Sequence, residues 1–132
     1  MEPYEWIELS ARGGPPRGFL EVLDRHQLPF SIERVFWISQ VSKEAVRGEH
    51  GHTVGHEILI PLQGALDLEL WSVDHGHTKL HLNSPKRALW LKPGSYIEMR
   101  HFDPSTILLV LCSHAFKDDP VSYSKKDFLA EP

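Results

Sequence analysis

Residues 57–72, which read EILIPLQGALDLELWS, decide the fold class of this chain. An apolar run comes first, Gly64 follows, and apolar residues then alternate with polar ones. Alternation with a period of two is typical of a strand that buries one face. Glycine between two such runs favours a turn, because it adopts backbone conformations that other residues avoid. This stretch therefore predicts two β-strands, over residues 57–63 and 65–72.

The same pattern continues on both sides of this stretch. Short runs are separated by Gly, Pro, Asn and Asp, and Asp74-His75-Gly76 is typical of a hairpin loop. We predict further strands over residues 17–22, 31–39, 78–82, 87–91, 96–102 and 106–113, and a short helix over residues 124–129. So many strands must close or stack to cover their edges. We expect an all-β fold, a small cupin or jelly-roll barrel with a short C-terminal helix, with a plain sandwich as the alternative.

The composition narrows the class of protein. The 132 residues are 41% hydrophobic and 24% charged, which predicts a single globular domain over residues 1–132. The formal net charge of −4 argues against nucleic acid or an anionic membrane as a partner. No apolar run approaches the roughly 18 to 20 residues that span a bilayer. The only cysteine, Cys112, lies in an apolar run and is expected to be a buried thiol. Because residues 1–6 are acidic where a signal peptide is basic, we expect a cytoplasmic protein.

Histidines form the group that points to chemistry. Of nine in the chain, His50 and His52 follow Arg47 in the run RGEHGH, and Glu57 comes shortly afterwards. Residues two apart on a strand project from the same face. If residues 53–56 form a hairpin loop, His52 and Glu57 lie opposite each other across the two strands. The sequence then predicts two imidazoles and a carboxylate in one small volume.

Three interpretations of this cluster compete. The spacing His50-x-His52-x4-Glu57 matches the first cupin signature, whose two histidines and glutamate bind a divalent metal ion. In that signature a fourth ligand follows a Pro-Gly turn, where this chain has Ile97, which cannot bind metal. Alternatively, a histidine pair provides a base and an acid near neutral pH without a metal. The third interpretation is a set of solvated polar residues beside a hairpin.

The order of several motifs resembles that of a known family. They run over about residues 17–128: Arg17-Gly18-Phe19-Leu20, LPFSIERVFWI at residues 28–38, Arg47-Gly48-x-His50-x-His52, Leu62-x-Gly64, Glu98-Met99 with Phe102, LVLCS at residues 109–113, and Asp127-Phe128. In this respect the chain is similar to the cupin-fold nucleotide-sugar 3,4-ketoisomerases, the WxcM-like sugar isomerases.

The resemblance implies an activity and a mechanism. Such enzymes convert a dTDP-4-keto-6-deoxy sugar into its 3-keto isomer without a metal or other cofactor, and they are homodimers that exchange an N-terminal strand. It implies that His50 and His52 are catalytic. We expect His52 to remove the proton from carbon and His50 to move a proton between the two oxygens. Arg47 is expected to stabilise the enolate and to reach the diphosphate.

Further substrate contacts and two departures complete the expectation. Candidate substrate-binding residues, besides Arg47, are Arg17, Arg34, Tyr96, Glu98 and Glu57. The family usually has a residue that does not bind metal at the position of Glu57 and a polar residue at that of Ile97. Two alternatives therefore stay open: a sugar-nucleotide-binding cupin without activity, and a metal-dependent cupin that uses His50, His52 and Glu57.

Overall fold

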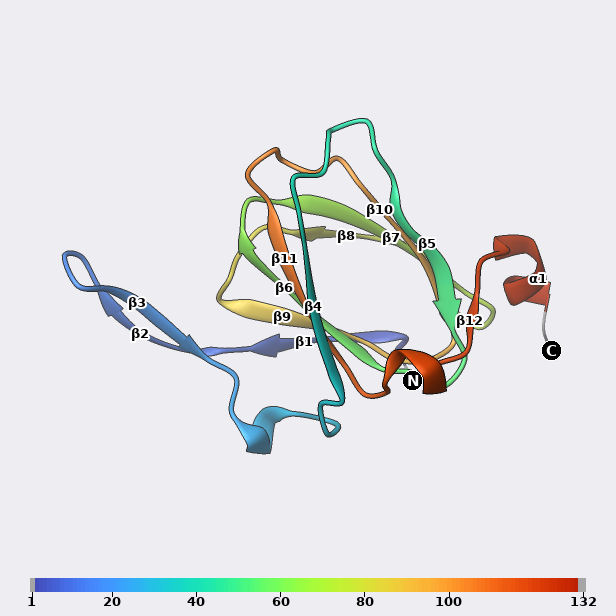
Figure 1. Cartoon of the computed structure of the whole chain (residues 1–132), viewed down its shortest axis with the longest axis horizontal. Helices are drawn as coiled ribbons and strands as arrows, with labels where there is room; N and C mark the ends of the chain where they lie inside the picture. The colour runs from blue at the N-terminus through green and yellow to red at the C-terminus, as the bar shows by residue number, and fades with distance from the viewer. Residues whose placement is uncertain (1, 131–132) are drawn as a thin grey trace.

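Two five-stranded antiparallel sheets face each other in the computed structural model, which describes residues 2–130 (Figure 1). The first sheet has the order β1 (Tyr4–Glu8), β9 (Arg87–Leu91), β6 (Glu57–Gln63), β11 (Ile107–Cys112) and β4 (Arg34–Ser39). The second has the order β12 (Val121–Ser122), β5 (Arg47–His52), β10 (Ser95–Arg100), β7 (Leu66–Ser72) and β8 (Gly76–Leu82). A separate hairpin joins β2 (Ser10–Gly14) to β3 (Gly18–Val22). Two 3-10 helices, η1 (Arg25–Gln27) and η2 (Phe116–Asp118), and the α-helix α1 (Lys125–Ala130) complete the chain.

This architecture confirms the predicted all-β class and the short C-terminal helix. From β4 to β11 the chain passes repeatedly between the two sheets, as in a jelly roll. The predicted strands over residues 57–63 and 87–91 match β6 and β9, and the predicted loop at Asp74-His75-Gly76 joins β7 to β8. Three short strands without a clear alternation, β1, β2 and β12, were not predictable from the sequence pattern.

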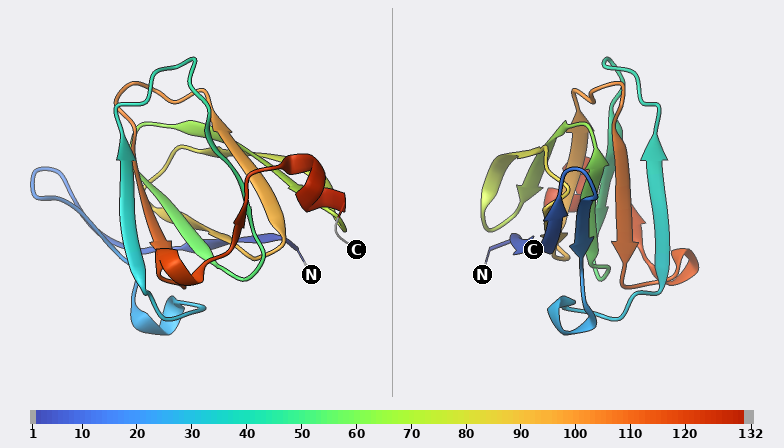
Figure 2. Two further views of the ribbon diagram at one scale, coloured as in Figure 1. Left: turned by 45° about the vertical axis from the view of Figure 1, so that its right-hand side comes forward. Right: turned by 90° about the vertical axis from the view of Figure 1, so that its left-hand side faces the viewer.

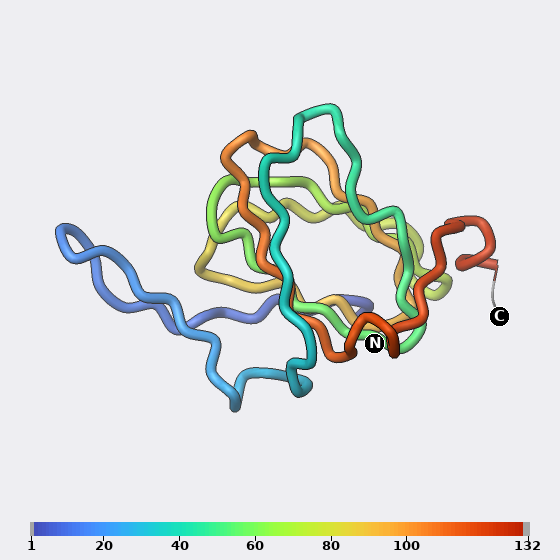
Figure 3. Tube along the Cα trace, viewed as in Figure 1, coloured from blue at the N-terminus to red at the C-terminus, as the bar shows by residue number. Residues whose placement is uncertain are grey.

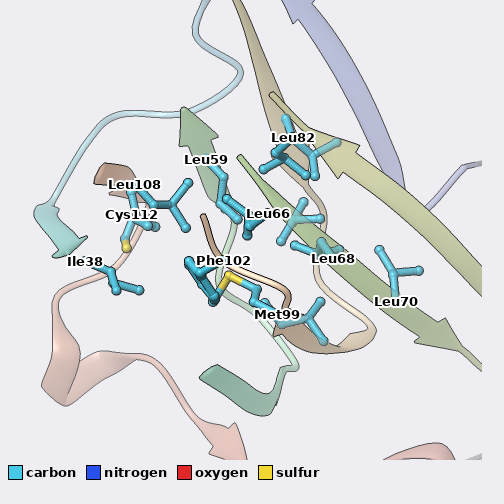
Figure 4. Close-up of a cluster of buried hydrophobic side chains, with 14 residues drawn as sticks. Ile38, Leu59, Leu66, Leu68, Leu70, Leu82, Met99, Phe102, Leu108 and Cys112 are labelled. Carbon is cyan, nitrogen blue, oxygen red and sulfur yellow. The ribbon is translucent and has the colours of Figure 1, made fainter. Parts of the chain in front are cut away.

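Leucines on alternate positions of β7 build the main core. Leu66, Leu68 and Leu70 are fully buried, and they pack with residues from both sheets, including Leu59 and Phe102. Figure 4 shows these side chains pointing toward one another between the strands. Burying one such side chain stabilises the fold by about 1.5–3 kcal/mol, so this cluster holds the two sheets together.

The connection between β5 and β6 differs from the prediction. Residues 53–56 do not close a hairpin, because β5 pairs with β10 and β12, whereas β6 pairs with β9 and β11. The loop instead carries the chain from the second sheet to the first, as Figure 2 shows. His52 and Glu57 therefore face each other between two sheets rather than across neighbouring strands. Loop length and polarity alone do not distinguish these two connections.

The hairpin of β2 and β3 projects away from the barrel (Figure 3). Phe19 and Leu20 on this hairpin are 55% and 60% exposed, an unusual exposure for large apolar side chains. Its packing against the rest of the described chain is therefore slight. Among the described residues, no helix combines the length and the apolar character needed to cross a lipid bilayer.

Candidate active site

A β-bulge in β5 sets the direction of the two histidines. The register between β5 and β10 shifts at Ile97, so that Glu49 has no partner on β10. Gly48 and Glu49 have positive φ angles of 83° and 54°. A bulge of this kind redirects the side chains that follow it. After the bulge, His50 lies opposite Ile97 and His52 lies two residues further along the same strand.

His50 borders a cavity of about 430 Å³ between the two sheets. That volume suits a small-molecule ligand. The polar side chains of its lining are Arg47, Glu49, His50, Glu57 and Tyr123, and the apolar ones include Phe36, Ile38, Leu59, Ile97 and Met99. The mixture of an apolar wall with a few polar groups is typical of a ligand site.

His52 lies behind His50 and is buried between two carboxylates. Its Nε2 lies 3.4 Å from Glu57 Oε1, and its Nδ1 lies 3.0 Å from Asp119 Oδ2. Burial lowers the pKa of His52, but Glu57 and Asp119 outweigh burial and raise the pKa from 6.5 to about 8. His52 therefore carries a proton at neutral pH.

Glu57 is the charge that balances this imidazolium. Its side chain is buried, which favours the neutral acid, but His52, His50 and Arg34 together lower its pKa. The thiol of Cys112 donates to Glu57 Oε2 over 3.8 Å. Burial and the negative charge of Glu57 raise the pKa of Cys112 to about 11. The thiol therefore stays protonated and buried, as the sequence predicts.

Arg34 contacts this cluster from β4. Its Nη2 donates to Asp119 Oδ2 and to Cys112 Sγ, each over 3.4 Å. The side chain is 20% exposed and does not border the large cavity. Arg34 is thus placed to neutralise a buried carboxylate rather than to meet a ligand directly.

The three residues of the cupin-like spacing are close enough for metal binding. One ligand atom each from His50, His52 and Glu57 lies within 4.8 Å of the others. Imidazole and carboxylate groups suit several divalent transition metals. Ile97, which also borders the cavity, brings no fourth ligand. The donor set therefore fits a metal with three protein ligands.

Of the remaining candidate substrate-binding residues, some border the cavity and others do not. Arg47 borders the cavity. Tyr96 and Glu98 do not, because on β10 the residues at 95, 97 and 99 face inward and those between them face outward. Tyr96 packs near Phe128, and Glu98 pairs with residues of the outer face.

Arg17 lies in the turn of the projecting hairpin, outside the cavity of its own chain. Arg17, Tyr96 and Glu98 therefore lie outside this cavity, and their contact with substrate stays a prediction. For Tyr96 and Glu98 the reason is the alternation of side chains along β10, which turns both away from the cavity.

Two residues of the site carry no signal in the sequence. Asp119 contacts His52, and Tyr123 borders the cavity, and both come from the segment between η2 and α1. No motif marks either one. Both residues lie near β5 because β12 pairs with β5. A strand of two residues is too short to be predicted from the sequence.

A protein-family model and a characterised protein both match this chain over most of its length. A model of the FdtA family, described as WxcM-like, C-terminal, matches residues 2–131. The TDP-4-oxo-6-deoxy-alpha-D-glucose-3,4-oxoisomerase of Aneurinibacillus thermoaerophilus is 30% identical over 105 residues, or 77% of this chain and 73% of that protein.

Two solved structures share the barrel. QdtA, a sugar 3,4-ketoisomerase from Thermoanaerobacterium thermosaccharolyticum in complex with TDP, matches with a TM-score of 0.88 and 27% identity, over 96% of this chain and 92% of QdtA. The TDP-quinovose 3,4-ketoisomerase WlaRB from Campylobacter jejuni matches with a TM-score of 0.90 and 27% identity, over 99% of this chain and 100% of WlaRB. These likenesses confirm the predicted cupin-type barrel.

Proposed function

The chain belongs to the FdtA family, WxcM-like, C-terminal, and from this membership we propose that it is a nucleotide-sugar 3,4-ketoisomerase. Its substrate is a dTDP-linked 4-keto-6-deoxyhexose, and its product is the 3-keto isomer. The observation that carries this proposal is the position of His50, a basic side chain on the wall of a cavity of small-molecule size. The names of the relatives agree with this reaction class.

The reaction needs only the transfer of protons. The C3 proton lies beside the C4 ketone, and its removal by a base gives an enediolate shared by C3 and C4. A proton then returns at C4, and a proton moves from the C3 oxygen to the C4 oxygen. No electron acceptor or added group is consumed, so a positioned base and acid suffice.

The surroundings of the two histidines support an order of roles opposite to the one expected from sequence. His50 borders the cavity and is placed to remove the carbon proton. His52 is buried, and its pKa of about 8 keeps it protonated, so it suits the role of an acid that supplies a proton to the oxygens. Ring centroids 4.7 Å apart allow the two imidazoles to act on one substrate.

Arg47 supports the recognition of the nucleotide diphosphate. It is exposed and borders the cavity, so its guanidinium can meet an anion that enters from solvent. A guanidinium binds phosphate oxygens in a bidentate way. Arg47 is the one arginine among the described residues that line the cavity, so it is the group there best suited to a diphosphate.

A homodimer that uses the β2–β3 hairpin is part of the proposal. The hairpin exposes Phe19 and Leu20, and the outer face of the first sheet exposes Trp37 and carries an apolar groove of about 370 Å³ beside Leu62. Arg17 then contacts substrate only if the hairpin carries it to the cavity of a second subunit. Sedimentation of wild type and of Leu20→Asp tests this, and a monomeric wild type contradicts it. A cytoplasmic location stays a prediction.

Solvent deuterium tests the reaction itself. Incubation of the protein with the dTDP-linked 4-keto-6-deoxyglucose in deuterated water should give a 3-keto product that carries deuterium at C4. Nuclear magnetic resonance detects the label directly. Absence of deuterium at both C3 and C4, with bound sugar nucleotide, would leave a sugar-nucleotide-binding protein without this activity.

A metal-dependent enzyme is the second candidate. The observation that favours it is the grouping of His50, His52 and Glu57 within 4.8 Å. A metal ion held there would polarise the ketone oxygen of a substrate. Elemental analysis of the purified protein separates this candidate from the first.

A further inference from the structure

We propose that Asp119 is a positioning residue of this enzyme, acting through His52. The inference rests on the proposed function and extends it to the C-terminal segment, to which no motif assigned a role. Asp119 does not border the large cavity, so it is not placed to touch the substrate. Its action is on the orientation and charge of the buried imidazole.

The contact between Asp119 and His52 is close and shielded from solvent. Asp119 Oδ2 lies 3.0 Å from His52 Nδ1, and the two side chains are 2% and 10% exposed. On the other side of the ring, Nε2 lies 3.4 Å from Glu57. An imidazole flanked by a carboxylate at each nitrogen has a preferred ring orientation, because rotation of the ring loses both contacts.

The space around Asp119 is shaped for its carboxylate. A Cβ atom at Gly55 would overlap the Asp119 carboxylate, so a larger residue there would displace that carboxylate. Arg34 Nη2 donates to Oδ2 over 3.4 Å from β4, on the other sheet. The carboxylate is therefore confined by the loop that follows β5 and held by a cation from the first sheet.

The backbone around Asp119 is tied to the strand that carries the histidines. β12 begins two residues later, where Val121 pairs with His52 and Ser122 pairs with Gly51. Further along, the ring of Phe128 in α1 packs against Gly51. Figure 2 shows this segment running along the outer edge of β5. Asp119 thus reaches His52 from a segment that is registered on the same strand.

The charges of the cluster agree with this role. With His52 protonated, the two carboxylates of Glu57 and Asp119 are balanced by the imidazolium and by Arg34. Loss of the Asp119 charge would leave the imidazolium with one carboxylate instead of two.

The test compares Asp119→Asn with Asp118→Asn, a matched control on an exposed neighbouring carboxylate. We expect Asp119→Asn to lower kcat by about 10- to 100-fold, as removal of an orienting partner does at other sites. KM should change by less than about twofold, because Asp119 does not border the cavity. Asp119→Glu should restore part of kcat. Asp118→Asn should leave kcat and KM at the wild-type level.

Equal effects of the two substitutions, or a loss in Asp119→Asn through KM alone, would overturn the proposal. A readout that needs no variant of Asp119 keeps it testable if that variant fails to fold. The ¹⁵N resonances of the wild-type His52 ring, assigned by comparison with His52→Gln, should show a proton on Nδ1 at neutral pH. A bare Nδ1 overturns the role of Asp119. Because this measurement uses no substrate, its failure is distinct from a failure of the proposed isomerase function.

Discussion

His50 and His52 lie edge to face, with ring centroids 4.7 Å apart and ring planes at 82°, yet only His50 borders the large cavity. Two residues of the same type on one face of one strand thus have different surroundings. One ring borders the cavity, and the other is buried between carboxylates. This difference leads to separate expectations for the two positions.

Replacement of His50 should remove the reaction and keep the binding of nucleotide. Because a positioned base contributes about 10²- to 10⁴-fold, His50→Asn should lower the rate of deuterium incorporation by at least about 100-fold. Calorimetry with dTDP should give an affinity close to that of wild type. His26→Asn, in the exposed η1, is the control. Wild-type turnover in His50→Asn would remove this residue from its role.

The ion pairs of His52 should make stability depend on pH. Because the pKa of His52 is raised from 6.5 to about 8 in the folded protein, the folded state binds this proton more tightly than the unfolded chain does. The stabilisation is complete below pH 6.5 and is lost as pH rises through about 8. A shift of this size corresponds to about 2 kcal/mol.

Urea unfolding at about pH 6 and about pH 9 measures this contribution. The free energy of unfolding of wild type should fall by about 2 kcal/mol more than that of His52→Gln between the two conditions. Parallel curves for the two proteins would contradict the assignment of the raised pKa to His52.

Gly51→Ala should destabilise the fold. A Cβ at residue 51 would lie 2.7 Å from the Phe128 ring, so α1 or the ring must move. Overpacking of this kind costs about 1–3 kcal/mol. Gly14→Ala is the matched control, since a Cβ there meets nothing within 4 Å. Phe128→Leu added to Gly51→Ala should recover part of the lost free energy of unfolding. Unchanged stability in Gly51→Ala would show that α1 moves aside at no measurable cost.

Metal removal should leave the activity intact. Because the proposed reaction needs only proton transfer, protein dialysed against a chelator should isomerise at the wild-type rate. Elemental analysis of the purified protein should find no stoichiometric iron, manganese, nickel or zinc. Stoichiometric metal that is lost in Glu57→Gln, together with activity restored by that metal, would favour the metal-dependent candidate instead.

Arg47→Gln should weaken the binding of dTDP. A charged hydrogen bond contributes about 1.5–3 kcal/mol, so the Kd should rise by about 10-fold or more. Calorimetry at two salt concentrations should also show a weaker salt dependence than wild type. Arg25→Gln, on the exposed η1, should bind as wild type does. Equal affinities of wild type and both variants for dTDP would show that the diphosphate does not contact Arg47.

Patterns within single strands made much of the fold predictable. The alternation of Leu66, Leu68 and Leu70 predicted both the strand and its buried face, because the period of side chains along a strand is fixed. The run His50-Gly51-His52 likewise predicted two imidazoles on one face. These predictions needed only neighbouring residues.

Relations between distant strands were not predictable in the same way. His52 and Glu57 lie close together, but through a loop between two sheets instead of the expected hairpin. Asp119 reaches His52 only because β12 pairs with the edge of β5. Tyr96 was a candidate substrate-binding residue, but the direction of its side chain depends on the register of β10. Sequence patterns predict where a strand lies and which of its faces is buried. The strands with which it pairs depend on the packing of the whole chain.

The single thiol of the chain lies beside the buried charges, where Cys112 Sγ contacts Glu57 and Arg34. With no exposure to solvent and a pKa near 11, it should react with a thiol reagent only when the two sheets separate. The rate at which Cys112 is labelled then measures how often the barrel opens, and no introduced probe is needed. A bound sugar nucleotide that holds the sheets together should lower this labelling rate. Labelling of the native thiol therefore reports how much of the protein has ligand bound.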